Sequence, residues 1–251
     1  MAEAYSSGRW SVHTTGSVDS TQKWVRQRLS ALSDRSVILA ESQTEGRGRT
    51  GRSWQSPPGG FYASFLLKPA PPLQFAQCVS LLGALVVTRI AAGRGLQAEV
   101  KWPNDVIISE RKIAGLIAET GGSAESWFVL GVGVNLKGAP RIPGRSVLPP
   151  GDFSMLTDPP GPEEFMQEFL EEFDFAWPHR NGHPLGGLMG ELREKLWNLG
   201  REVSVKAGEE EIRGIVKGLD ENGSLILSTD SGDRRLAAGE LLTVHGESVK
   251  K

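Results

Sequence analysis

The sequence predicts an α+β protein built in two parts. Apolar runs of strand length recur between residues 10 and 140 and alternate with segments of helical length and spacing. From Arg201 onward, short stretches alternate apolar and polar residues and are separated by turn sequences such as Asp220-Glu-Asn-Gly223. We therefore expect a larger sheet with packed helices, followed by a small all-β unit of about fifty residues.

Composition favours an ordinary soluble protein with one buried thiol. The chain has 251 residues, and 28 Lys and Arg against 30 Asp and Glu give a net charge of -2, which offers no bulk positive field to nucleic acid. Cys78 is the single cysteine, so an intramolecular disulfide or a cysteine-rich zinc site is excluded. No signal peptide is visible, and Arg89 interrupts the longest apolar run below bilayer-spanning length. We expect a cytoplasmic protein without a membrane partner.

The first elements are a strand and a capped helix. Residues 10–14 form a strand candidate, and Ser20 or Thr21 can cap the exposed N–H groups of the helix that follows. Such a cap can be purely structural, or it can contact an anion, because helix N-termini attract negative charge. Residues 37–41 and 61–67 are strands on either side of a glycine-rich loop, which places that loop at the rim of a sheet.

This loop contains three glycines interleaved with three arginines between Gly46 and Arg52 and ends at Trp54. Glycine lets main-chain N–H groups approach a ligand closely, and the arginine fork fits carboxylate or phosphate oxygens in pairs. The pattern indicates a flexible cationic cradle for an anion. A solvated surface turn is the alternative, since Gly/Arg loops are common on protein surfaces.

Residues 73–92 have the length and apolar spacing of a core helix. The strand candidate 98–109 is interrupted at residues 101–105, because Pro103 cannot donate to a sheet ladder. The Lys, Asn and Asp side chains at this break can contact phosphate, ribose or a metal ion. Alternatively, Asn104 and Asp105 only close the turn through their own backbone.

Two glycine-containing strands come next. Lys112 begins the strand 112–119, and Gly115 inside it suggests that a ligand approaches the backbone there. The apolar strand 127–136 contains two glycines and one amide, that of Asn135, and we interpret it as the wall of a binding site. It is not a dinucleotide fingerprint, because no helix follows it and the third glycine is missing.

Two further helices are predicted after a Pro- and Gly-rich stretch. The first begins at residue 162 with proline and acidic residues in its first turn, and it presents Phe165, Phe169 and Phe173 on one face. Residues 185–199 form the second, closed by a glycine. Both are expected to pack on the main sheet.

Four motifs, taken in order, resemble the biotin protein ligase family over about residues 10–140: Gly46-Arg-Gly-Arg-Thr-Gly-Arg-Ser-Trp54, Lys101-Trp-Pro-Asn-Asp105, Arg111-Lys-Ile-Ala-Gly115 and Gly131-Val-Gly-Val-Asn135. The resemblance implies a mixed sheet with packed helices akin to class II aminoacyl-tRNA synthetases, followed by a small SH3-like β-barrel. It implies a catalytic domain over residues 1–199 and a C-terminal domain over residues 200–251.

The resemblance also implies roles for individual residues. Lys112 matches a catalytically important lysine of the family, and it would act together with Arg47 and Arg49. The residues implied to contact biotin are Ser20, Thr21, Gln22, Gln43, Arg47, Gly48, Arg49, Lys112, Gly115 and Gly131. Those implied to contact ATP or the adenylate are Arg49, Arg52, Trp54, Lys101, Asn104 and Asn135. Gln22 is often asparagine in the family, a difference that keeps the amide.

The implied function is an ATP-dependent ligase that makes biotinyl-5'-AMP and transfers biotin to a lysine of a biotin carboxyl carrier protein domain. Mg²⁺ would accompany ATP, with Asp105 as its candidate ligand, and no tightly bound prosthetic group is expected. A lipoate or octanoate ligase or transferase of the same fold is one alternative. A non-catalytic biotin sensor is another.

Family members that repress transcription carry a helix-turn-helix domain before the catalytic region. Here the catalytic region starts almost at once, so we expect the monofunctional type, which does not bind DNA. Both a monomer and a homodimer are compatible with the sequence.

Overall fold

The chain is described by a computed structural model over residues 3–68, 75–122, 126–140, 148–177 and 183–245. The strands of its main sheet are β1 (Glu3–Ser7), β2 (Trp10–Val18), β3 (Ser36–Gln43), β4 (Phe61–Leu67), β5 (Ala98–Lys101), β6 (Asp105–Ile108), β7 (Arg111–Gly121) and β8 (Trp127–Val134). The helices beside it are α1 (Thr21–Arg26), α2 (Ala76–Gly93) and α3 (Pro162–Ala176).

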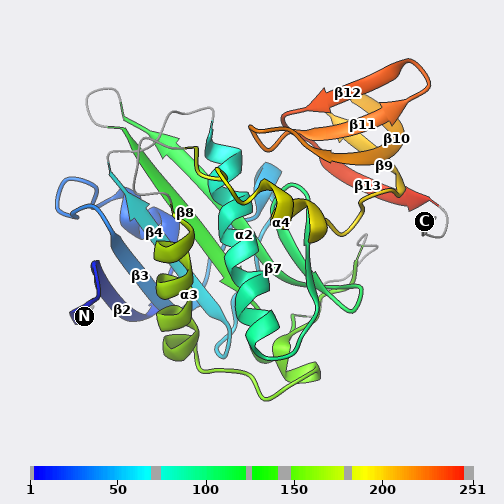
Figure 1. Cartoon of the computed structure of the whole chain (residues 1–251). Helices are drawn as coiled ribbons and strands as arrows, with labels where there is room; N and C mark the ends of the chain where they lie inside the picture. The colour runs from blue at the N-terminus through cyan, green and yellow to red at the C-terminus, as the bar shows by residue number, and fades with distance from the viewer. Residues whose placement is uncertain (1–2, 69–74, 123–125, 141–147, 178–182, 246–251) are drawn as a thin grey trace.

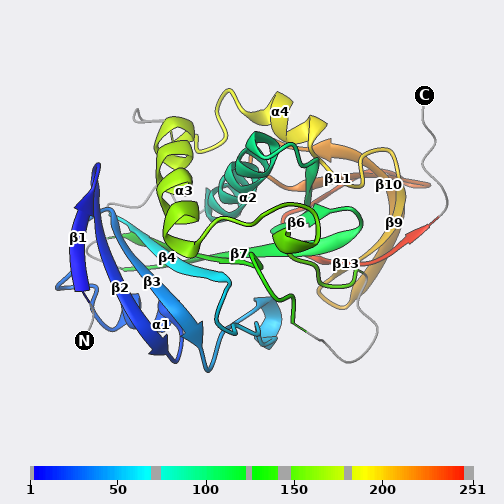
Figure 2. The same cartoon turned by 90° about the horizontal axis from the view of Figure 1, so that it is seen from below.

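The eight strands form one mixed sheet in the order β1-β2-β3-β4-β8-β7-β6-β5. Strands β2 and β3 run parallel, and the other neighbouring pairs are antiparallel. Helices α2 and α3 cover one face of the sheet and α1 lies on the other (Figures 1 and 2). The predicted α+β class is confirmed.

Coverage of both faces explains why the central strands are apolar without interruption. All seven residues of β4 are buried. Phe65 packs against Phe169 of α3 with ring centroids 4.8 Å apart, whereas its neighbour Leu66 points to the opposite face and belongs to a smaller cluster with Val25 of α1. Successive side chains of a strand point to opposite faces, so a strand covered on both sides needs apolar residues throughout.

Helix α2 is the core helix that the sequence predicted, although residues 73–74 of the predicted span lie outside the described residues. It is long and apolar enough to cross a membrane by composition, but 72% of it is buried within the fold. A Cβ at Gly83 would lie 2.7 Å from Leu116 of β7, which shows how closely the helix backbone packs on the sheet.

Two elements differ from the prediction. Strand β1 was not predicted, because its residues are mostly exposed and it pairs only as an edge strand with β2. The continuous helix over residues 185–199 is wrong, since only α4 (Met189–Glu194) is helical. Gly187 has a φ of 81°, and this left-handed backbone conformation is incompatible with an uninterrupted helix.

The C-terminal strands form a second sheet: β9 (Glu202–Ala207), β10 (Glu210–Leu219), β11 (Leu225–Thr229), β12 (Gly232–Leu236) and β13 (Glu240–His245). Its order is β12-β11-β10-β9-β13 and every pair is antiparallel. This confirms a β-rich C-terminal part. Within the described residues no ladder joins β12 to β13, so closure into an SH3-like barrel stays a prediction.

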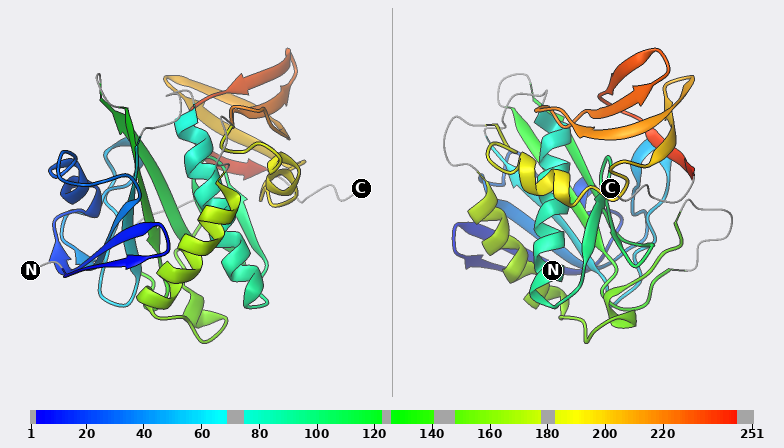
Figure 3. Two further views of the ribbon diagram at one scale, coloured as in Figure 1. Left: turned by 60° about the vertical axis from the view of Figure 1, so that its left-hand side comes forward. Right: turned by 45° about the vertical axis from the view of Figure 1, so that its right-hand side comes forward.

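The second sheet packs against α2 and the turn between β5 and β6, as Figures 1 and 3 show. The buried indole of Trp102 donates from Nε1 to the carbonyl oxygen of Gly223 at 3.0 Å. Cys78 Sγ lies 3.8 Å from the carbonyl oxygen of Glu221, and burial raises the pKa of this thiol to about 12. Cys78 is thus an inert buried thiol, as predicted, and it marks the contact between the two sheets.

Candidate functional site

A cavity of about 640 Å³ lies over strands β7 and β8 of the main sheet. The residues that the sequence assigned to the site all line it: Ser20, Thr21, Gln22, Gln43, Arg47, Gly48, Arg49, Arg52, Trp54, Lys101, Asn104, Asp105, Lys112, Gly115, Gly131 and Asn135. The start of α1, the glycine-arginine loop, the β5–β6 turn and strands β7 and β8 supply them. The fold therefore brings the four motifs together.

One end of the cavity is uncharged and its polar groups bond to one another. Gln43 Oε1 accepts from the backbone N–H of Thr21 at 2.9 Å and from its hydroxyl at 3.1 Å, and Gln43 Nε2 donates to Ser56 Oγ at 2.8 Å. Ser64 Oγ donates to Thr21 Oγ1 at 2.8 Å. Ser20 stands at the N-cap position of α1, but its hydroxyl caps no backbone N–H. The cap expected of Ser20 or Thr21 is thus replaced by the Gln43 side chain.

Gln22 forms part of the floor at this end. Its Nε2 donates to the carbonyl oxygen of Ile117 at 3.2 Å. A Cβ on Gly131 would come within 2.7 Å of Gln22 Cδ. Gly131 is therefore required by the protein's own side chain, which in turn presents its amide to the cavity.

The glycine-arginine loop folds back as a narrow hairpin. Gly48 N–H donates to the carbonyl oxygen of Arg52 at 2.7 Å, and Trp54 N–H donates to that of Gly46 at 2.8 Å. A Cβ at Gly46 would lie 2.3 Å from the Trp54 carbonyl oxygen, so only glycine fits there.

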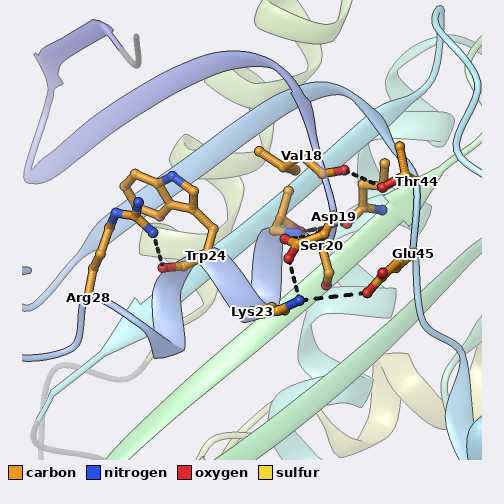
Figure 4. Close-up of polar contacts among 10 residues, drawn as sticks. Val18, Asp19, Ser20, Lys23, Trp24, Arg28, Thr44 and Glu45 are labelled. Carbon is orange, nitrogen blue, oxygen red and sulfur yellow. Dashed lines mark hydrogen bonds and ion pairs between the residues drawn. The ribbon is translucent and has the colours of Figure 1, made fainter.

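Backbone and ion-pair contacts tie the beginning of this loop to the start of α1 (Figure 4). Glu45 N–H donates to the carbonyl oxygen of Asp19 at 2.7 Å. The ammonium of Lys23 lies 2.5 Å from Asp19 and 3.7 Å from Glu45. The helix and the loop are consequently positioned as one unit at the mouth of the cavity.

Trp54 explains the glycines of the two neighbouring strands. A Cβ on Gly115 would be 3.1 Å from the indole ring, and one on Gly133 would be 2.7 Å from Trp54 Nε1. Lys112 Nζ lies 5.4 Å from the ring centroid, which is cation–π distance. The group that approaches the backbone at Gly115 is therefore the protein's own tryptophan, which forms a wall between the two ends of the cavity.

The other end of the cavity is strongly cationic. Lys112 Nζ lies 2.7 Å from Asp105 Oδ1, and Lys101 Nζ lies 3.7 Å from Asp105 Oδ2. Lys101 is almost completely buried, and desolvation lowers the pKa of its ammonium despite the nearby carboxylate. Two lysines thus share a single carboxylate, so the pair of ammonium groups is only partly neutralised.

Arg49 and Arg52 add two more positive charges. Arg49 Nη1 lies 3.5 Å from Asn104 Oδ1 and 3.4 Å from the carbonyl oxygen of Gly239, and burial lowers the pKa of its guanidinium. Arg52 forms an ion pair with Glu240, whose hydrogen bond raises the pKa of Arg52. Together with exposed Arg47, these groups form a site suited to phosphate oxygens.

Two asparagines have structural duties. Asn104 Nδ2 donates to the carbonyl oxygen of Leu116 at 2.7 Å, and Asn135 Nδ2 donates to that of Gly151 at 2.9 Å. The Asn104 amide thus joins the β5–β6 turn to β7, which differs from the alternative in which it only closes its own turn. Their side-chain oxygens remain as acceptors at the cavity wall.

The described residues contain no group of three or more His, Cys, Asp or Glu side chains able to hold a metal ion. Asp105 is one of two carboxylates that line the cavity, and its oxygens already face two lysines. This donor set fits Mg²⁺ held mainly by phosphate oxygens and waters, with a single protein carboxylate in support.

Sequence reasoning missed a short segment of the C-terminal sheet. Gly239, Glu240 and Leu241 line the cavity beside the arginines. They belong to no motif and lie about two hundred residues beyond α1 in the chain, so only the packing of the two sheets could reveal them.

Comparisons with known proteins agree with this geometry. Residues 15–135 match the Biotin/lipoate A/B protein ligase family, and residues 199–241 match the Biotin protein ligase C terminal domain. A biotin--[acetyl-CoA-carboxylase] ligase of Paracoccus denitrificans is 31% identical over 89% of this chain and 96% of its own length. The bifunctional ligase/repressor BirA of Escherichia coli is 30% identical over 89% of this chain and 71% of its own length.

A solved structure shares the whole architecture. The biotin protein ligase from Aquifex aeolicus in complex with biotin and ATP is 28% identical, with a TM-score of 0.77 over 92% of this chain and 97% of that one. The C-terminal match is specific to biotin protein ligases, whereas the larger match alone includes lipoate enzymes. The chain is a member of the biotin protein ligase family.

Proposed function

We propose that this protein activates biotin with ATP as biotinyl-5'-AMP and transfers the biotinyl group to a lysine of a biotin carboxyl carrier protein domain. The observation that carries the proposal is the cavity with an uncharged, hydrogen-bonding end and a cationic end. Biotin has a neutral ring system and an anionic carboxylate, and ATP is a polyanion. The two ends match the two reactants in charge.

The uncharged end is the proposed site for the biotin rings. Ser20, Thr21, Gln22 and Gln43 offer hydroxyl and amide groups that can pair with the N–H and C=O groups of a ureido ring. Gly131 leaves room for the Gln22 side chain against β8, and Gly115 leaves room for the Trp54 indole against β7. Because these groups are held in position by hydrogen bonds to one another, a ligand that lacks the ureido ring would form fewer hydrogen bonds with them.

The cationic end is the proposed site of adenylation. A carboxylate oxygen of biotin attacks the α-phosphorus of ATP, the bond to the β-phosphate oxygen breaks, and pyrophosphate leaves with the electron pair. Lys112, which lines the cavity, would bridge the carboxylate and the α-phosphate, while Arg47 and Arg49 would stabilise the phosphate oxygens as charge shifts between them. Arg52, Trp54, Lys101, Asn104 and Asn135 would contact the nucleotide.

In the second step the amine of the carrier lysine attacks the acyl carbon of the adenylate. AMP leaves, the amine loses a proton and an amide forms. Mg²⁺ enters with ATP, and Asp105 is its proposed protein ligand, which requires its carboxylate to release one of the two lysines. No step requires a histidine.

Residues 1–199 are proposed as the catalytic domain and residues 200–251 as the C-terminal domain. We place the protein in the cytoplasm, where ATP and carrier domains are available. Absence of DNA binding and a monomeric or homodimeric state stay predictions.

The test is ATP–pyrophosphate exchange with biotin, lipoate or neither acid, in the presence of Mg²⁺. We expect exchange only with biotin, followed by labelling of a carrier domain on one lysine. Exchange with lipoate instead would favour the lipoate enzyme. Biotin binding without any exchange would favour the sensor.

A further inference from the structure

Glu240 is a carboxylate from the C-terminal sheet that lies inside the cationic end of the cavity. It begins β13, lines the cavity and forms an ion pair with Arg52. The side chains are 35% and 62% exposed, so the pair faces the solvent that a ligand would displace. The hydrogen bond from Arg52, and more weakly the charges of Lys101 and Arg49, lower the pKa of the Glu240 carboxyl.

The backbone holds Glu240 firmly in this position. Gly239 accepts from Arg49 at 3.4 Å through its carbonyl oxygen, and a Cβ at Gly239 would lie 2.9 Å from Val205 and 3.4 Å from Trp102. Glu240 pairs with Lys206 in the ladder between β13 and β9. Gly239 packs closely on Trp102, which lies in the turn between β5 and β6. The fold therefore fixes the position of Glu240 beside the arginines.

The charges that line the cavity indicate a role for the Glu240 carboxylate. Five cationic side chains line the cavity, Arg47, Arg49, Arg52, Lys101 and Lys112, against the two carboxylates Asp105 and Glu240. Asp105 contacts the two lysines, which leaves Glu240 as the counter-ion of the arginines. A partly exposed ion pair is weak, whereas a pyrophosphate group carries more charge and more acceptor oxygens.

We propose that Glu240 is a built-in counter-ion that pairs with Arg52 and yields this arginine to the phosphates of the nucleotide when ATP binds. It thereby holds the glycine-arginine loop against the C-terminal sheet until ATP arrives. Glu240 acts through Arg52 and is a positioning residue. The inference rests on the proposed function in one respect, since the arginines must bind phosphate.

The test compares pyrophosphate binding to wild type, Glu240→Gln, Arg52→Gln and the control Glu210→Gln, by calorimetry without biotin. Glu210 forms a comparable exposed pair with Arg234 at 3.0 Å in the same sheet but does not line the cavity. We expect Glu240→Gln to bind pyrophosphate about three- to tenfold more tightly and Arg52→Gln to bind it more weakly by a similar factor. Glu210→Gln should match wild type.

The decisive result is a change in pyrophosphate affinity of opposite sign in Glu240→Gln and Arg52→Gln. If the ion pair were purely structural, removing either partner would change the affinity in the same direction. Unchanged or weaker binding by Glu240→Gln would overturn the proposal, and so would equal losses in both variants. If Glu240→Gln fails to fold, Glu240→Asp, which keeps the charge on a shorter stem, should bind with intermediate affinity. Biotin-dependent exchange by wild type is measured separately, so a failed ligase assignment is recognised independently of pyrophosphate binding.

Discussion

The two ends of the cavity are built on different physical principles. At the uncharged end, Thr21 of α1 and Ser56 of the loop before β4 bond to Gln43 of β3 and Ser64 of β4 in one network. At the cationic end, five positive side chains face two carboxylates, and one of those carboxylates comes from the other sheet. The first arrangement is complete without a ligand, whereas the second carries excess charge that a ligand can neutralise.

This difference explains how one cavity can bind one substrate selectively and the other mainly through charge. A buried polar network of fixed geometry discriminates by shape and hydrogen bonding, because a ligand of another shape cannot reach the donors and acceptors that it presents. A partly exposed cationic group attracts any polyanion and its affinity falls with salt. Specificity for the acid should therefore come from the first end, and binding energy for the nucleotide from the second.

The largest effect is expected at the boundary between the two ends. Replacing Lys112 with alanine removes the cation that lies between Asp105 and Trp54 and should lower the rate of biotin-dependent exchange about 10²- to 10³-fold. Lys217→Ala, on the far side of the C-terminal sheet, is the control. If exchange by Lys112→Ala equalled that of wild type, Lys112 would have no part in adenylation.

A matched pair of glycine substitutions addresses each end separately. Gly131→Ala places a methyl group 2.7 Å from Gln22, and Gly133→Ala places one 2.7 Å from Trp54. Overpacking of this kind costs about 1–3 kcal/mol, so we expect roughly a tenfold increase in KM for biotin from the first variant and for ATP from the second. Equal changes in both constants would show that the two ends are not separate.

A smaller effect is expected from the contact between the sheets. Trp102→Phe removes the donor to Gly223 and should loosen the segment that carries Glu240. We expect KM for ATP to rise about threefold while KM for biotin stays constant, because a lost buried hydrogen bond is worth only about 1–2 kcal/mol. An equal rise in KM for biotin would contradict this.

The reactivity of Cys78 reports on the same contact. Its raised pKa keeps the thiol protonated near pH 8, so iodoacetamide should alkylate the wild type very slowly. In Trp102→Phe the rate should increase, since the thiol lies beside Glu221 in the loosened contact. An unchanged rate would mean that the indole does not hold the sheets together.

Much of the main sheet could be predicted from the chain because burial on both faces leaves uninterrupted apolar runs, as in β4. The site could be predicted because its residues cluster in short motifs at strand ends and loops. The edge strand β1 could not, because it has no apolar side to read. The predicted helix over residues 185–199 is wrong in its first part, because the backbone at Gly187 has a φ of 81° and cannot continue a helix.

The glycines show a subtler limit. Gly115 and Gly131 were expected to admit a ligand, but the groups packed against them are Trp54 and Gln22. A glycine in a strand predicts that some group packs closely on the backbone there. Only the folded structure identifies that group. Glu240 could not be predicted either, because its partner Arg52 is far away in the chain.

The most direct test of the division between the two ends is a kinetic comparison of Thr21→Val with Arg49→Gln in biotin-dependent exchange. Thr21→Val keeps the volume but removes the hydroxyl that bonds to Gln43 and Ser64, so KM for biotin should rise about tenfold or more with KM for ATP nearly unchanged. Arg49→Gln should raise KM for ATP by a similar factor and leave KM for biotin nearly unchanged. If each variant changed both constants to the same extent, the cavity would be a single undivided site and the account would be contradicted.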